Sequence, residues 1–399
     1  MIETILLVIY WSLFVIFSIQ VSLLLIQSVL GTPNSGVQTN NDYSELCSDI
    51  SSCILIPAHN EEDVIEDTIL SLLNEITATD EILVVADNCG DKTTEILEKL
   101  DVKFIERTDE TNRGKGYALA FGVNFILSNL PDVDVLIIVD ADCDCSKLNV
   151  SNLKTSCHHL RSPIQCLNIM TNSENPSVQS KIAEFAWLYK GWIRQSANSI
   201  LSMPAQLQGT GMAFPKRIFT TFNFDTGSIV EDLEYGLTLT AQGTKPSFTQ
   251  LSKVVSTFPT DTVTTNAQRS RWEHGHLNVI FNQLPQFFLT AIMTRNYKLL
   301  WQVIDASIPP ISLLTFSLII LVLISLLLMI IDLSYITLAM TLCFMFAISI
   351  MIGWYKVGRD ILTLRDIIHV PIFIIKKISI YFNYIFNKQL SWNKTKRDK

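Results

Sequence analysis

Charged residues are scarce in this chain of 399 residues: they make up 17% of it, while hydrophobic residues make up 48%. An ordinary soluble domain carries about 25% charged residues, so part of this chain is expected to lie in lipid. Charge is absent altogether from residues 5–30, 307–331 and 333–354. Each run is long enough to cross a bilayer as a helix. Only Asp332 separates the last two runs, which predicts an anchor followed by a helical hairpin with a very short turn.

The first run also lacks the features of a cleaved signal peptide. It is too long, no basic residue precedes it, and "LGTPNSG" is a weak cleavage site, so a retained anchor is favoured. Lysine and arginine are absent from the N-terminus and the hairpin turn but are concentrated after the third run. Positive residues stay on the cytoplasmic side. The prediction is a multi-pass protein of the inner (plasma) membrane, with the tail and the central region in the cytoplasm.

There is no excess of positive charge and no disulfide framework. The net charge of −8 argues against nucleic acid as a partner. The eight cysteines show no small-domain disulfide spacing and are interpreted as reduced thiols. Cys143 and Cys145 could form half of a metal site, but no second Cys/His pair stands at ligand spacing, so a structural role is favoured.

The central region alternates short apolar strands with helical stretches, which is typical of an α/β sheet. Strands are predicted at residues 53–57, 81–86, 103–106, 134–139, 164–170, 207–214 and 248–255. Helices are predicted to begin at Glu61, Lys92, Lys115, Pro176, Val230 and Thr265. The predicted division of the chain is an anchor (1–33), a linker (34–50), the α/β domain (51–277), interfacial helices (278–305), a transmembrane hairpin (306–356) and a basic amphipathic cytoplasmic tail (357–399).

Two stretches, 278–304 and 364–386, mix aromatic and aliphatic residues with basic ones. We expect both to form helices that lie in the membrane interface. The second could instead be a fourth span, but Lys376 and Lys377 in its middle would be costly in hydrocarbon.

Three carboxylates follow the very apolar strand 134–139: Asp140, Asp142 and Asp144. Such a strand is expected at the centre of a sheet covered on both faces. Ligands of open α/β sheets bind beyond the carboxyl ends of the strands. Closely spaced carboxylates repel one another unless a cation is present, and their oxygens suit Mg²⁺ or Mn²⁺. A solvated acidic turn with an N-capping Asp is the alternative.

Further polar clusters follow the other predicted strands. Glu61 and Asp87 stand at strand ends, where a carboxylate can accept from a ribose hydroxyl or can cap a helix. In "RGKGYAL" the glycines allow close approach of the backbone to a ligand, and Arg113 and Lys115 suit a phosphate. A Walker loop is excluded by the spacing. The remaining clusters are "GTGMAF", "VEDLEYG" and "QRSRWEHGH"; in the last, His274 and His276 are interpreted as structural.

Taken in order, "IPAHNEE", "VVADNCGDKT", "RGKGYAL", "IVDADC", "GTGMAF", "VEDLEYG" and "QRSRWEHGH" resemble the family 2 glycosyltransferases of GT-A fold. The resemblance is to the membrane-bound bacterial exopolysaccharide enzymes related to cellulose, hyaluronan and poly-N-acetylglucosamine synthases. It implies a GT-A (nucleotide-diphospho-sugar transferase) domain with a mixed, mostly parallel sheet, plus transmembrane and interfacial helices.

The resemblance also implies roles for individual residues. The nucleotide-sugar donor would be bound by Pro57, His59, Glu61, Asp87, Arg113, Lys115, Asp140, Gln268 and Arg271. Asp140 and Asp142 would hold Mg²⁺ or Mn²⁺. Asp232 would be the base, accompanied by Glu231, and the acceptor would contact Gly209, Thr210, Gly211 and Trp272.

The expected activity is transfer of one sugar, with inversion, from a nucleotide-diphosphate donor, expected to be a UDP-sugar, to a hydroxyl of a polyprenyl-diphosphate-linked saccharide in cell-surface glycan synthesis. Three aliphatic spans look too few to line a polymer channel, which disfavours a processive synthase unless a partner channel or other polysaccharide-assembly proteins contribute. A nucleotidyltransferase would have no use for "QRSRW" or a membrane hairpin. A noncatalytic export subunit would not need Asp140, Asp142, Asp232 and Arg271 together.

Overall fold

The computed structural model describes residues 2–33, 49–259 and 262–386, and its centre is a seven-stranded sheet of order β3-β2-β1-β4-β6-β5-β7. The strands are β1 (Ser52–Ala58), β2 (Asp80–Asp87), β3 (Phe104–Arg107), β4 (Val135–Ile138), β5 (Ile164–Thr171), β6 (Met212–Pro215) and β7 (Ser247–Thr257). β6 pairs antiparallel with β4 and β5, and all other neighbours pair in parallel. The predicted mixed, mostly parallel sheet is confirmed.

The strand predicted at residues 207–214 begins later than expected. β6 starts at Met212, because residues 208–211 form a loop in which Gly209 and Gly211 have φ angles of +83° and +65°. A Cβ atom on Gly211 would lie 2.1 Å from the sulfur of Cys166. Glycine is therefore required here both for its backbone conformation and for its lack of a side chain.

Alternate residues of the strands point to opposite faces, and each face has its own helical layer. One layer is formed by α2 (Ile65–Leu73), α3 (Thr93–Lys99) and α5 (Val150–Leu160), which pack on residues such as Ile54 and Ile137. The other is formed by α4 (Lys115–Asn129), α8 (Lys216–Phe219) and α9 (Glu231–Ala241), which pack on Leu55 and Leu136. Helix α5 was not predicted. The predicted helix starts at Lys115, Lys92 and Val230 fall within one residue of the observed ones.

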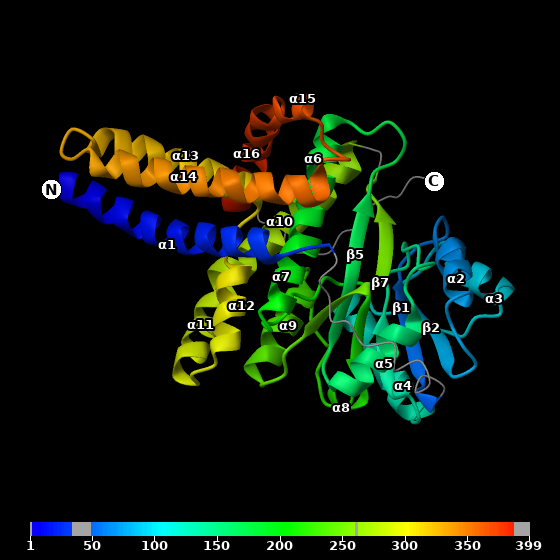
Figure 1. The fold of residues 1–399 in the computed structure, drawn as a ribbon. Helices are drawn as coiled ribbons and strands as arrows, with labels where there is room; N and C mark the ends of the chain where they lie inside the picture. The colour runs from blue at the N-terminus through cyan, green and yellow to red at the C-terminus, as the bar shows by residue number, and fades with distance from the viewer. Residues whose placement is uncertain (1, 34–48, 260–261, 387–399) are drawn as a thin grey trace.

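Three apolar helices project together from one side of this domain (Figure 1): α1 (Ile2–Leu30), α13 (Ile311–Leu328) and α14 (Ser334–Gly353), the last continued by η4 (Trp354–Gly358). Within the described residues these are the helices long and apolar enough to cross a membrane. They match the three predicted spans. The hydroxyl of Tyr10 donates to the carbonyl of Tyr335 over 2.8 Å, which joins the far end of α1 to the start of α14.

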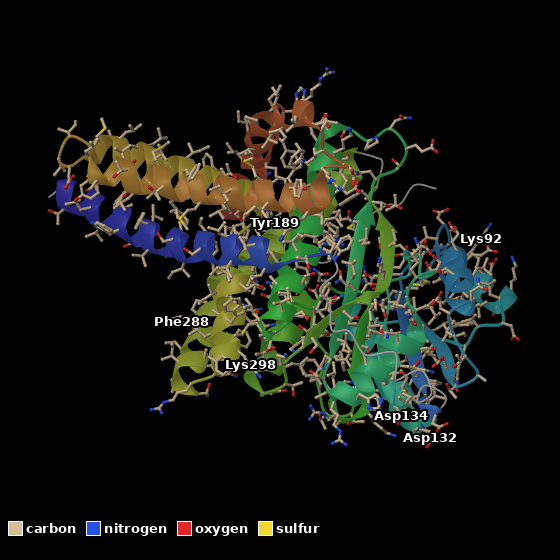
Figure 2. All side chains as sticks on the ribbon, viewed as in Figure 1. Lys92, Asp132, Asp134, Tyr189, Phe288 and Lys298 are labelled. Atoms are coloured by element: carbon tan, nitrogen blue, oxygen red, sulfur yellow. The ribbon has the colours of Figure 1, made fainter. Side chains whose placement is uncertain are left out.

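Buried polar contacts join the near ends of these helices to the sheet domain. Arg194, at the end of η2 (Tyr189–Arg194), pairs with Asp305 over 2.7 Å, and Gln27 of α1 donates to the same carboxylate over 2.7 Å. Tyr189 contacts Ser28 and Ser349, each over 2.7 Å. Figure 2 shows Tyr189 at this junction, between the domain and the apolar helices.

The helices after the domain run in other directions. α10 (Thr262–Asn278) continues through η3 (Val279–Gln283) into α11 (Leu284–Met293) and α12 (Tyr297–Ala306), and Figure 1 shows α11 and α12 crossing the direction of α1. α11 exposes the apolar side chains of Phe288, Leu289, Ile292 and Met293, and Phe288 lies on its outer side (Figure 2).

The segment after the hairpin forms α15 (Leu364–Ile367) and α16 (Val370–Phe386), and α16 packs against α10 and α13. Both segments predicted as amphipathic are helical, and their location in the interface stays a prediction. Most of the predicted linker and the end of the tail, residues 34–48 and 387–399, lie outside the described residues.

Candidate active site

A pocket opens at the carboxyl ends of β1, β2 and β4. Its lining residues are Pro57, Ala58, His59, Glu61, Asp87, Asn88, Arg113, Gly114, Lys115, Ala118, Asp140, Ala141 and Arg271. All the predicted donor-binding residues except Gln268 line it. The sheet brings them together because parallel neighbours end at one edge, while α10 adds Arg271 from a distant part of the chain.

One wall of the pocket is built around the buried carboxylate of Asp87. Arg107 contacts it over 2.6 Å, and both side chains are only 9% exposed. Burial raises the pKa of Asp87, although the contact with Arg107 opposes that shift. The Nδ1 atom of His59 lies 2.6 Å from the backbone carbonyl of Asp87 and ties β1 to β2. Arg107 was not predicted, although it lies opposite Asp87 in the register of β3 with β2.

Lys115 stands at the start of α4 and faces three oxygen atoms. Its Nζ lies 2.5 Å from Oδ1 of Asp140, donates to the carbonyl of Gly209 over 2.7 Å and lies 3.9 Å from Glu231. Burial acts to lower the pKa of Lys115, but Asp140 and Glu231 together raise it above its usual value. The lysine is therefore fully charged at neutral pH and links the donor pocket to the acidic pair on α9.

Glu231 and Asp232 begin α9 next to this lysine. Glu231 is buried, and burial raises its pKa to about 7, against the opposing effect of Lys115. Burial also raises the pKa of Asp232, whose Oδ1 accepts from the amide of Leu233 over 2.8 Å. Neighbouring carboxylates add to these shifts, since Asp232 raises the pKa of Glu231 and Asp140 raises that of Asp232, so this pair can accept a proton near neutral pH.

The loop that is predicted to contact the acceptor, residues 209–211, has one residue that faces the site and two that lie beneath it. Gly209 faces the site, because a Cβ atom there would lie 3.3 Å from Nζ of Lys115 and 3.6 Å from Oδ2 of Asp232. Thr210 is buried, and its hydroxyl accepts from the amide of Asp140 over 3.1 Å. Thr210 and Gly211 thus lie below the site surface, where they hold the loop and the end of β4 in place.

Helix α10 contributes the remaining predicted residues. Arg271 lines the pocket, whereas Gln268 is buried and does not line it. Trp272 is half-buried and packs against Trp187 of α6 (Val178–Leu188), with ring centroids 5.2 Å apart. Trp187 was not predicted, because it lies far from Trp272 in the chain and belongs to none of the motifs.

The two histidines of "QRSRWEHGH" have backbone partners. The Nε2 atom of His274 lies 2.9 Å from the carbonyl of Ile380, and that of His276 lies 2.8 Å from the carbonyl of Ala306. Burial lowers the pKa of His276 to about 3, with Lys190 nearby adding to the shift. Both contacts are in keeping with the predicted structural role.

The residues at the end of β4 suit a divalent cation. Asp140 and Asp142 are both half-buried there, and Asp140 lines the pocket beside the cationic Lys115, Arg113 and Arg271. The described residues hold no group of three His, Cys, Asp or Glu side chains at ligand spacing. Mg²⁺ commonly takes one or two protein carboxylates and completes its shell with substrate phosphates and water, so a two-carboxylate site fits.

Comparison with known proteins identifies the family. The model of "Glycosyl transferase family 2" matches residues 53–205, and that of "Glycosyl transferase family group 2" matches residues 136–352, more than half of the chain. The probable glycosyltransferase YdaM of Bacillus subtilis is 28% identical over 59% of this chain and 57% of its own length. The poly-beta-1,6-N-acetyl-D-glucosamine synthase of Staphylococcus aureus is 25% identical over 61% and 58% respectively. The match thus spans little more than half the length of these relatives.

Among solved structures, the mannosyltransferase PcManGT from Pyrobaculum calidifontis, in complex with GDP-Man and Mn²⁺, aligns with a TM-score of 0.54 and 13% identity. The alignment covers 97% of this chain and 99% of that one. At this identity the similarity shows a shared fold, and that shared fold extends over the apolar helices as well as the sheet.

Proposed function

Because this chain belongs to glycosyl transferase family 2, we propose that it transfers a sugar from a nucleotide-diphosphate donor to a hydroxyl of a lipid-linked saccharide at the cytoplasmic face of a membrane. The observation that carries the proposal is the contact of Lys115 with both Asp140 and Glu231. It brings a site suited to a diphosphate next to a carboxylate pair suited to a proton.

The donor would bind in the pocket. The nucleoside would lie against His59 and the Asp87–Arg107 pair, and the diphosphate would face Lys115, Arg113 and Arg271. Asp140 and Asp142 would hold Mg²⁺ or Mn²⁺, which when bound would neutralise charge on the leaving diphosphate. The cations of this chain contribute to the same stabilisation, because they face the place where negative charge develops.

The transfer is a single displacement. The acceptor oxygen attacks the anomeric carbon, the bond from that carbon to the diphosphate oxygen breaks, and the nucleoside diphosphate leaves with the bonding electrons. Asp232 takes the proton of the acceptor hydroxyl. Attack opposite the leaving group inverts the anomeric configuration.

A second candidate is processive synthesis of a polysaccharide, which the named synthase from Staphylococcus aureus favours. The apolar helices favour a single transfer instead. α13 and α14 carry no charged residue and expose apolar side chains such as Leu323 on α13 and Phe344 on α14, as expected of helices that face lipid.

The test uses the full chain purified in detergent. It would be incubated with a panel of nucleotide sugars, UDP-N-acetylglucosamine first, and with polyprenyl-linked saccharides extracted from bacterial membranes. Release of nucleoside diphosphate and a lipid product heavier by one sugar, seen by mass spectrometry, are expected. A ladder of longer products would favour the processive alternative, and no release from any donor would overturn the proposal.

A further inference from the structure

Two tryptophans from distant parts of the chain, Trp187 and Trp272, pack against each other. The Nε1 atom of Trp187 donates to the carbonyl of Asn168 over 3.0 Å, which fixes the orientation of its ring. The rings of Trp187 and Trp272 are tilted by 40° with centroids 5.2 Å apart, and both residues are half-buried. Trp272 follows Arg271, a lining residue of the donor pocket. The pair therefore presents partly open aromatic surface next to that pocket.

Unsatisfied amide groups lie next to this pair. Within the described part of the chain, Oδ1 of Asn168 and Oε1 of Gln208 are buried without a hydrogen-bond partner. Gln208 directly precedes Gly209, whose Cβ position is 3.6 Å from Oδ2 of Asp232. Buried polar atoms normally have a partner, so these two orphaned amide oxygens, one of them on the residue before Gly209, indicate a place for ligand hydroxyls near Asp232.

The backbone of the neighbouring helix approaches these amides closely. A Cβ atom on Gly191 would lie 3.3 Å from Nε2 of Gln208 and 3.5 Å from the carbonyl of Asn168. Gly191 belongs to η2, a π-helical segment that interrupts the α-helix between Trp187 and Gln195. Such segments shift the direction of side chains and are frequent at functional sites.

Lys190 belongs to the same π-helical segment. It is half-buried, and among the described residues no hydrogen bond or ion pair of its ammonium group is found. Burial and the nearby Arg194 lower its pKa, while attraction to Asp232 opposes that shift. A partly buried ammonium group without a partner is unfavourable, so this position is difficult to explain by stability alone.

From these contacts we infer that Trp187 and Lys190, together with Trp272 and the amides of Asn168 and Gln208, form the subsite for the terminal pyranose of the acceptor saccharide. The inference rests on the proposed function and adds to Trp272 two residues, Trp187 and Lys190, that no motif contains. An aromatic pair suits the C–H face of a pyranose, because that face is apolar while the ring edge carries hydroxyls. Those hydroxyls can accept from Lys190 and donate to the orphaned amide oxygens.

A neutral saccharide fits this subsite better than a phosphate group does. Asp232 and the buried Glu231 would repel an anion placed between them and Trp187. Of the two cations on η2, Arg194 is already paired with Asp305. On this helical segment only Lys190 would be available to balance a phosphate, whereas a hydroxyl needs only one of its donors.

The test measures UDP release by the purified full chain from UDP-N-acetylglucosamine, or from whichever nucleotide sugar is turned over, with and without a disaccharide of N-acetylglucosamine. The variants are Trp187→Ala, Trp187→Phe, Lys190→Met and Lys190→Arg. Lys181→Met and Trp192→Phe are matched controls from the same helical segment. Lys181 pairs with Asp366 and Trp192 donates to Gln250, and neither partner belongs to the inferred subsite.

The disaccharide is expected to accelerate release by the wild-type chain. Trp187→Ala and Lys190→Met should each raise the KM for the disaccharide at least about tenfold, because loss of a stacking contact or of one hydrogen bond to a charged group weakens binding by about that factor. The donor KM should stay within about twofold of wild type. Trp187→Phe and Lys190→Arg should recover part of the loss, and the controls should match wild type. A purely structural role would change both KM values or the yield of folded protein.

Two results would overturn the inference while leaving the proposed function standing. One is normal UDP release that the disaccharide does not accelerate in wild type. The other is an unchanged disaccharide KM in Trp187→Ala and Lys190→Met. Absence of release from every donor would instead refute the proposed function itself.

Discussion

The Nζ atom of Lys115 lies 2.5 Å from Oδ1 of Asp140 and only 3.9 Å from Oε1 of Glu231. One cation thus touches a carboxylate at the end of β4 and a carboxylate at the start of α9. These two elements are far apart in the sequence, and the lysine is the direct link between the part of the site that would bind the diphosphate and the part that would accept the proton.

Replacing this lysine should therefore impair both functions. Lys115→Met is expected to lower kcat/KM at least about 100-fold, because it removes the positive charge nearest the leaving group and leaves Asp140 and Glu231 to repel each other. Steady-state kinetics of nucleoside diphosphate release, with a donor that the wild-type chain turns over, would measure it. Lys103→Met is the matched control, since Lys103 pairs with Glu81 and both side chains are nearly half-exposed. Activity of Lys115→Met within threefold of wild type would contradict this role.

Much of the fold could be predicted from sequence because the strands are short, apolar and followed by polar clusters. β1, β2 and β4 lie within about one residue of their predicted ranges. Helix α5 was missed because the apolar stripe that it buries, Val150, Leu153 and Cys157, is narrow, and three polar residues beside it, Lys154, Thr155 and Ser156, are buried as well. Lys154 can be buried because it contacts Asp80 over 2.7 Å, a pairing that depends on the tertiary fold.

The site was predictable to the extent that it lies in motifs at strand ends. Arg107 could have been found by aligning β3 with β2, because it lies opposite Asp87. Trp187 and Lys190 could not, since their approach to Trp272 and Asp232 depends on how α6 and η2 pack on β5. Long-range packing of this kind leaves no local pattern in the sequence.

The ion pair of Asp87 with Arg107 is expected to matter for stability as well as for binding. Arg107→Met should destabilise the folded domain by about 3–5 kcal/mol, because it leaves a buried carboxylate without its partner. Denaturation in detergent would measure the change, with the exposed Arg217→Met as control. The double variant Asp87→Asn/Arg107→Met should be more stable than Arg107→Met, because it no longer buries an unpaired charge. A double variant less stable than Arg107→Met would contradict this role of the ion pair.

Activity is expected to depend on a divalent cation. Chelation should abolish release of the nucleoside diphosphate, and Mg²⁺ or Mn²⁺ should restore it, because the leaving diphosphate needs neutralisation. Asp142→Asn should require a higher metal concentration for half-maximal rate. Asp144→Asn is the matched control, because the Asp144 backbone pairs with Val255 and its exposed side chain caps a turn at Ser146. Full activity of the wild type in excess chelator would exclude this requirement.

Glu231 should make the folded state less stable as the pH rises. Burial raises its pKa from 4.5 to about 7, so between these values the folded state binds more protons than the unfolded state. The contribution of Glu231 to the free energy of unfolding is therefore fully present below pH 4.5 and is lost as the pH rises to about 7. Thermal unfolding in detergent should show a smaller fall of Tm over this range for Glu231→Gln than for wild type. Asp225→Asn, at an exposed position, should behave as wild type, and an identical slope for Glu231→Gln would show that Glu231 does not titrate there.

Kinetic measurements can distinguish the role of Asp232, the proposed base, from that of its neighbour Glu231. Asp232→Asn should lower kcat by at least about 100-fold while the donor KM changes little, because the lost group acts on the acceptor hydroxyl. Glu231→Gln should lower kcat less and should also raise the donor KM, since it changes the surroundings of Lys115. If Asp232→Asn turned over normally, the base would have to be Glu231. Glu234 is a poor substitute because its Oε1 atom already accepts from Ser228 over 2.6 Å.

The orientation of the domain on the membrane leads to the last prediction. α11 crosses the direction of the apolar helices, and Met293 and Leu289 on it are 83% and 60% exposed. Exposed apolar side chains on a helix that runs along a membrane surface are expected to enter the boundary between head groups and acyl chains. In lipid vesicles, the fluorescence added by Met293→Trp should be quenched by brominated acyl chains. Leu70 is also exposed, at 45%, but it lies on α2 at the far side of the sheet. The fluorescence added by Leu70→Trp should therefore not be quenched by the brominated acyl chains. Equal quenching at both positions, or none at Met293, would show that α11 does not hold the active site against the membrane.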